Sequence, residues 1–96
     1  MSDRLDDATI AAELEKLPGW KRDGATLERV VEAKDFDAAM AFVNAIAHIA
    51  NAVNHHPDIA ISWNKVTIRS SSHDAKGITS RDVDLAMRIQ AILTPR

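Results

Sequence analysis

The sequence predicts an α+β fold, in which three helices cover one face of a four-stranded antiparallel sheet in the order α-β-β-α-β-β-α. Two segments alternate apolar and polar residues around a short turn, as β-hairpins do. Three other segments repeat apolar residues at helical spacing. The 96 residues have the length of one domain, which we place at residues 1–96. The spacing leaves open whether the two hairpins pair with each other.

The first third of the chain predicts a short helix followed by a hairpin. Asp6 and Asp7 supply the negative charge that the first turn of a helix favours, and Pro18-Gly19 ends the apolar pattern that follows. Asp23-Gly24 then separates two extended runs, which is a strong signal for a two-residue hairpin turn. Trp20, close to that turn, is expected in the core.

Residues 35–54 predict a long helix with Asp35 as its N-cap. Its apolar residues cover more than one side, so we expect the sheet on one side and another subunit on the other. His48, inside this helix, is expected in solvent or at an interface. We judge that no apolar run approaches the roughly 20 residues that a bilayer-spanning helix needs, and we expect no membrane partner.

Pro57 ends the long helix, and a second hairpin and a last helix follow. Asn64-Lys65 is predicted as the two-residue turn of this hairpin, because Asn tolerates the left-handed conformation. Thr79 is expected to cap the final helix, with Asp82 at the capping-box position. Asp82 also extends the apolar stripe of that helix. A buried carboxylate needs a partner, which the nearby histidine loop could supply.

The composition excludes several classes of function. Twelve basic and fourteen acidic residues show no electrostatic signature of nucleic-acid binding. The chain has no cysteine, which excludes disulfides and thiolate chemistry, and its three glycines are too far apart for a phosphate-binding loop. The first residues are acidic and lack an apolar signal core, so we expect a cytoplasmic protein.

The groups that can transfer protons collect around three histidines. His55 and His56 are adjacent at the end of the long helix, and His73 follows the second hairpin. Residues that flank a hairpin lie at the same end of it, so we expect the three side chains close together, with Asp82 nearby. Imidazole titrates near neutral pH, which suits acid–base catalysis. A metal site and surface histidines without a role remain alternatives, although adjacent histidines are not a recognised metal-binding spacing.

An ordered set of motifs resembles the pterin-4a-carbinolamine dehydratase family over nearly the whole chain from Leu14. The motifs are Asn54-His55-His56-Pro57-Asp58, Trp63-Asn64-Lys65-Val66, Ser71-Ser72-His73, and Gly77-Ile78-Thr79 with Asp82, preceded by Leu17-Pro18-Gly19-Trp20 and Lys34-Asp35-Phe36.

The resemblance implies dehydration of 4a-hydroxytetrahydropterin to quinonoid dihydropterin, in the recycling of the tetrahydropterin cofactor. It implies that His55 and His73 are the acid–base pair, that His56 binds and positions the pterin, and that Asp82 supports the loop histidine. It implies no metal or organic cofactor, a small-molecule pterin as partner, and a homodimer or homotetramer. Together with the polar loop, it indicates substrate contacts at Asn51, Asn54, His56, Pro57, Ser71 and Ser72.

Two positions depart from the family pattern. Asn51 stands where an acidic residue is expected, and it can still form a hydrogen bond but carries no charge. Ile59 stands where some members carry Trp. If the missing carboxylate acts on His55 or on the pterin, activity is reduced. The alternative function is therefore a non-catalytic pterin-binding or partner-binding module of the same fold.

Overall fold

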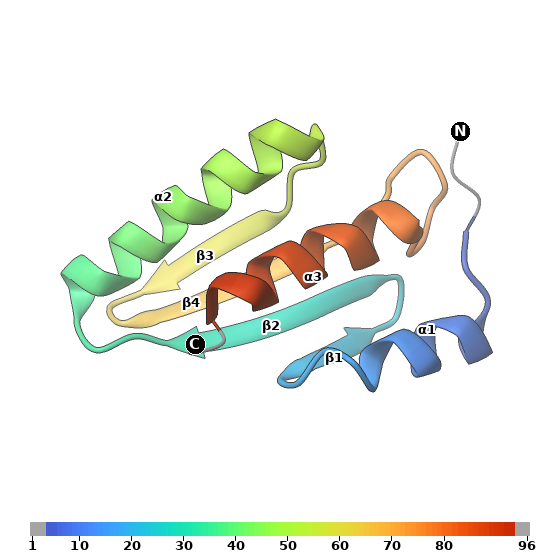
Figure 1. Ribbon diagram of the computed structural model, residues 1–96, viewed down its shortest axis with the longest axis horizontal. Coiled ribbons are helices and arrows are strands. Elements are labelled where there is room, and N and C mark those ends of the chain that lie inside the picture. The colour runs from blue at the N-terminus through green and yellow to red at the C-terminus, as the bar shows by residue number, and fades with distance from the viewer. Residues whose placement is uncertain (1–3, 94–96) are drawn as a thin grey trace.

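The computed structural model describes residues 4–93, and its elements follow the expected order (Figure 1). They are α1 (Asp7–Leu14), β1 (Trp20–Asp23), β2 (Thr26–Glu32), α2 (Phe36–Val53), β3 (Asp58–Ser62), β4 (Lys65–Ser70) and α3 (Ser80–Leu93). The predicted fold class is confirmed.

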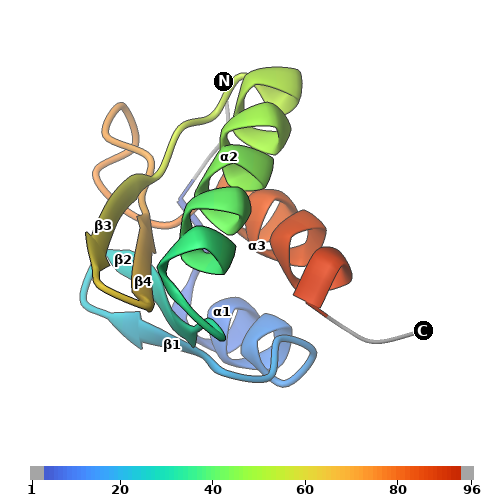
Figure 2. The same ribbon diagram turned by 90° about the vertical axis from the view of Figure 1, so that its left-hand side faces the viewer.

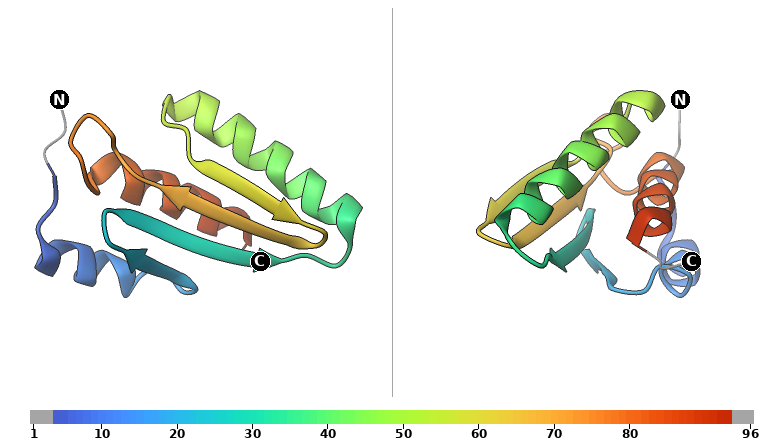
Figure 3. Two further views of the ribbon diagram at one scale, coloured as in Figure 1. Left: turned by 180° about the vertical axis from the view of Figure 1, so that it is seen from behind. Right: turned by 60° about the vertical axis from the view of Figure 1, so that its left-hand side comes forward.

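The four strands form one antiparallel sheet in the order β1-β2-β4-β3. The two hairpins therefore join through β2 and β4, with Val30 opposite Thr67 near the middle of that pair. All three helices lie on one face of the sheet, and the other face is not covered by any of them (Figures 2 and 3).

The alternation along β4 decides which side chains face the helices. Val66, Ile68 and Ser70 are buried beneath them, so Arg69 points to the open face. Leu27, Val66 and Ile68 of the sheet meet Ile46, Leu85 and Ile89 of the helices in one core. Trp20 is buried in the same core, which confirms its predicted place.

Both hairpin turns lie one residue away from their predicted positions. Asp23 pairs with Thr26, so the first turn is Gly24-Ala25, in which Gly24 has a φ of 60°. A turn with positive φ at its first central position alone needs only one glycine there.

The second turn is Trp63-Asn64, because Ser62 pairs with Lys65. Trp63, with a φ of 53°, takes the left-handed conformation expected of Asn64. Asn64 instead donates its side-chain Nδ2 to the carbonyl of Ala33 at 2.9 Å. The asparagine thus ties the hairpin to the segment between β2 and α2.

The long helix α2 begins as predicted, since the Asp35 carboxylate accepts the N–H of Ala38 at 2.8 Å. It packs on the sheet through few residues, and Phe36 and Met40 stay 47% and 39% exposed. His48 is exposed, as expected for a solvent or interface position.

By length and composition alone, α2 is the one helix of residues 4–93 that could cross a membrane, which corrects the expectation that no run approaches this length. The core helix of a soluble protein passes the same test, so this is weak evidence. The expectation of a cytoplasmic protein stays a prediction.

Candidate active site

Four element ends meet at one end of the sheet: the C-terminus of α2, the start of β3, the end of β4 and the start of α3 (Figure 1). Asn54 ends α2 in the left-handed conformation, with a φ of 53°. The chain then turns, and the two histidines that follow diverge. His55 is buried, with 9% of its surface exposed, whereas His56 is exposed.

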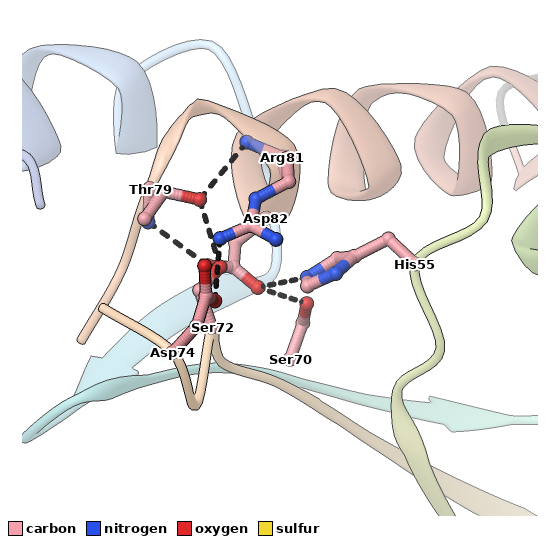
Figure 4. A network of polar contacts seen from close by, with 7 residues as sticks. All are labelled: His55, Ser70, Ser72, Asp74, Thr79, Arg81 and Asp82. Carbon is pink, nitrogen blue, oxygen red and sulfur yellow. Dashed lines mark hydrogen bonds and ion pairs between the residues drawn. The ribbon is translucent and has the colours of Figure 1, made fainter. Parts of the chain in front are cut away.

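Asp82 is fully buried and accepts four hydrogen bonds (Figure 4). Its Oδ1 accepts from His55 Nε2 at 2.6 Å and from the Ser70 hydroxyl at 2.5 Å. Its Oδ2 accepts from the Ser72 hydroxyl at 2.8 Å and from the Thr79 N–H at 2.9 Å. The carboxylate is tolerated at 0% exposure because donors surround both of its oxygens.

Two hydrogen bonds at Thr79 confirm the predicted start of the last helix. Asp82 reaches back to the Thr79 N–H, and the Thr79 hydroxyl accepts the Arg81 N–H at 3.2 Å. This reciprocal pattern is a capping box with Asp in place of Glu.

The structure corrects the expected partner of Asp82, which is His55 and not His73. Within residues 4–93, no hydrogen bond or ion pair joins His73 to this carboxylate. Ser72 and His73 are neighbours that point to opposite sides, so Ser72 is buried beside Asp82 and His73 is exposed. Because the Asp82 carboxylate accepts a hydrogen bond from His55 Nε2, the ring hydrogen is assigned to Nε2. The other ring nitrogen, Nδ1, is left for another partner.

His56 and His73 line a small cavity of about 70 Å³ on the open face of the sheet. The expected proximity of these two histidines is confirmed, but His55 does not line this cavity. The volume admits the edge of a ring and not a whole bicyclic ligand. The lining residues are Thr26, His56, Asp58, Arg69, Ser71 and His73.

The expected substrate contacts divide into two groups. Ser71 lines the cavity with His56. Ser72 is buried and forms hydrogen bonds with Asp82, at 2.8 Å, and with the Thr79 hydroxyl, at 2.7 Å, so it supports the site from inside. Asn54 and Pro57 lie beside the two histidines but do not line the cavity.

Asn51 contacts His56, where the sequence led us to expect an effect on His55 or on the ligand. Its Oδ1 lies 2.9 Å from His56 Nε2. The last turn of α2 therefore holds the outward-facing histidine. An amide forms this contact without the charge that a carboxylate would add.

Three residues of the cavity wall were not predicted from the sequence: Thr26, Asp58 and Arg69. Arg69 had a usable signal, because strand alternation puts it on the same face as Ser71. Thr26 comes from β2, and its position depends on the β2–β4 pairing, which spacing does not determine.

Arg69 is anchored on the open face by two carboxylates. Its guanidinium forms ion pairs with Asp23, at 3.1 Å, and with Glu28, and Lys21 also contacts Glu28 at 3.2 Å. The hydrogen bonds that Arg69 donates to Asp23 and Glu28 raise the pKa of Arg69 above its already high ordinary value. One wall of the cavity therefore contains a guanidinium group that two carboxylates hold in place.

The metal-site interpretation loses support from this geometry. The four residues considered for a metal site split between the buried side and the open face, and no group of three or more His, Asp or Glu side chains suited to a metal occurs within residues 4–93. A separate cavity of about 480 Å³ lies between residues 4–7, the β1–β2 turn and residues 76–78, and no histidine lines it.

Comparison with known proteins identifies the class. Residues 3–92 match the family described as Pterin 4 alpha carbinolamine dehydratase. The chain belongs to this family, which is one of dehydratases, that is, of hydro-lyases.

A protein of Thermomicrobium roseum with the provisional name pterin-4-alpha-carbinolamine dehydratase is 50% identical over 86 residues, which cover 90% of this chain and 92% of that protein. A crystal structure from Brucella melitensis, described as a transcriptional coactivator/pterin dehydratase, matches with a TM-score of 0.91 and 28% identity, over 96% of this chain and all of that one. A pterin dehydratase-like protein described as a RuBisCO assembly factor in the alpha-carboxysome shares the fold, with a TM-score of 0.65, 17% identity, and coverage of 80% of this chain and 89% of that one.

Proposed function

We propose that this chain dehydrates 4a-hydroxytetrahydropterin to quinonoid dihydropterin, and so takes part in recycling a tetrahydropterin cofactor. The observation that carries the proposal is the meeting of three histidines at one end of the sheet. Two of them line a cavity, and the third is held by a buried carboxylate. Family membership supports the same substrate class.

The reaction needs one proton donated and one removed. Protonation of the 4a-hydroxyl lets it leave as water, and loss of the N5 proton forms the new double bond between C4a and N5. The protons balance, and no electrons are transferred to or from the protein. The chemistry therefore calls for a positioned acid and base and for no redox cofactor.

In the proposed mechanism, His73 donates the proton to the departing hydroxyl and His55 removes the N5 proton. Asp82 holds the Nε2–H of His55, so Nδ1 is the nitrogen that can act as base. The His55 side chain keeps 10% of its surface exposed, and the substrate has to reach this part of the ring. His56, held by Asn51, positions the pterin.

The test follows the absorbance of the 4a-adduct in a coupled hydroxylase assay with single histidine variants. His73→Ala should lower kcat by on the order of 10²- to 10⁴-fold, and His56→Asn should mainly raise KM. The exposed His48 on α2 provides the control, since His48→Asn should leave both constants unchanged. Full activity of His73→Ala would overturn the mechanism.

The same assay decides which second histidine transfers a proton. A large kcat loss in His55→Asn supports the buried pair with Asp82. A large kcat loss in His56→Asn, with little change in His55→Asn, would assign proton transfer to the two histidines that line the cavity.

A non-catalytic pterin-binding or partner-binding module is the second candidate, and Asn51 favours it. The uncharged amide holds His56 where an acidic residue would also stabilise a protonated ring. This function predicts pterin binding by calorimetry without turnover. A rate that appears only in Asn51→Glu would support it, and turnover by the unchanged chain would exclude it.

We also propose that the chain forms a homodimer or homotetramer through α2. Phe36 and Met40 are large apolar side chains that remain exposed on this helix. Sedimentation should give a mass of two or four chains, and Met40→Glu should reduce it. A monomer at micromolar concentration would contradict this proposal.

A further inference from the structure

We propose that Asp58 is a substrate-binding residue that accepts hydrogen bonds from the 2-amino group and N3–H of the pterin ring. This inference rests on the proposed function and adds to it the orientation of the ring. It also predicts which ring system the site prefers.

Asp58 is an unpaired carboxylate in the wall of the cavity that His56 and His73 line. It begins β3 and lies directly opposite Arg69 of β4 in the strand register. Opposite charges in such cross-strand positions usually attract each other. Here Asp58 is exposed and forms no ion pair or side-chain hydrogen bond within the part of the chain that the structure describes.

The reason is that Arg69 is held by other carboxylates. Its two terminal nitrogens contact Asp23 and Glu28 on the side of β2 and β1, away from β3. With Lys21, this open-face cluster contains two positive and two negative side chains. The charge of Asp58 is therefore not compensated, and the cavity has a free acceptor beside two histidines.

A carboxylate binds best to a planar pair of parallel N–H donors, as it does in its contacts with guanidinium groups. The pterin ring has such a pair in its 2-amino group and N3–H. The cavity of about 70 Å³ has room for one edge of a ring, which suits this edge-on contact. C4a is two bonds from N3, so a ring held at Asp58 brings its reacting atoms toward the two histidines.

The proposal predicts discrimination between two closely related rings. Lumazine has a carbonyl in place of the 2-amino group, and its oxygen would face the Asp58 carboxylate without a hydrogen between them. A site built to accept a hydrogen bond rejects an analogue that lacks the donor, because the bound ring covers the acceptor and leaves it unpaired. The chain should therefore bind pterin more tightly than lumazine.

The test measures the affinity of pterin and of lumazine by fluorescence titration for the unchanged chain and for Asp58→Asn. The substitution should weaken pterin binding by about 10- to 100-fold and bring the pterin-to-lumazine ratio close to one. Asp84→Asn is the matched control, because Asp84 is an exposed carboxylate on α3 that pairs with Arg88 at 3.0 Å. It should change neither affinity.

The outcomes separate this inference from the function on which it rests. Unchanged pterin affinity in Asp58→Asn, or an equal loss for both rings, overturns the role of Asp58 and leaves the dehydratase proposal standing. Failure of the unchanged chain to bind either ring overturns the proposed function and this inference with it. A purely structural role for Asp58 would lower both affinities together and leave their ratio unchanged.

Discussion

Replacing Asp82 by alanine should destabilise the fold more than any surface substitution. The carboxylate accepts four hydrogen bonds at 0% exposure. Without it, Ser72 keeps its contact with the Thr79 hydroxyl at 2.7 Å. The other three donors, His55 Nε2, the Ser70 hydroxyl and the Thr79 N–H, lose their acceptor. Three buried donors left unpaired at about 1–3 kcal/mol each lower the free energy of unfolding by about 3–9 kcal/mol, and we take a value toward the lower end, about 4 kcal/mol. Breaking a buried charged pair costs about the same, roughly 3–5 kcal/mol.

Urea unfolding monitored by the fluorescence of the buried Trp20 measures this loss. A domain of this size has a slope of about 1 kcal/mol per molar urea, so the midpoint should fall by about 4 M. Asp82→Asn keeps the volume and one acceptor oxygen, and it should lose about half as much. Asp84→Ala removes an exposed ion pair and should cost less than about 1 kcal/mol. A folded Asp82→Ala variant within about 1 kcal/mol of the unchanged chain would refute the argument.

Two further predictions concern the free energy of unfolding. Asp35→Ala should lower the free energy of unfolding by about 1 kcal/mol, because the substitution removes the N-cap of α2. Asp35→Asn keeps a capping oxygen and should change the free energy of unfolding little. Equal losses in the two variants would contradict the capping role. The hydrogen bond from Arg81 lowers the pKa of Asp74 below its ordinary 3.8. This pair therefore stabilises the fold above that pH, and the contribution is lost as the pH falls through the lowered value. In urea unfolding, Asp74→Asn should lower the free energy of unfolding at pH 7 and leave it unchanged at pH 2. A loss of unfolding free energy that does not depend on pH would contradict the role of the Asp74–Arg81 pair.

Several features of the site followed from the sequence through local rules. The flanks of a hairpin lie at the same end, which predicted that His56 and His73 would be close, and the structure brings both to one cavity. The helical stripe predicted a buried Asp82 that needs a partner, and its burial is complete.

The same rules did not determine which histidine meets which partner. Adjacent residues diverge, and the direction in which each points depends on the left-handed Asn54 and on how the turn after α2 packs. Spacing therefore suggested His73 as the partner of Asp82, whereas the packed structure brings His55 to it and leaves Asn51 to hold His56.

By itself, the sequence determined the order of the elements, the helix caps and the end of the sheet at which the reactive groups collect. These depend on period, on turn chemistry and on hydrogen bonds between residues close in the chain. Only the tertiary structure decided that β2 pairs with β4, that Arg69 is held by Asp23 and Glu28, and that Asp58 remains unpaired. Those contacts join strands far apart in the chain, and their geometry depends on how the two hairpins pack together.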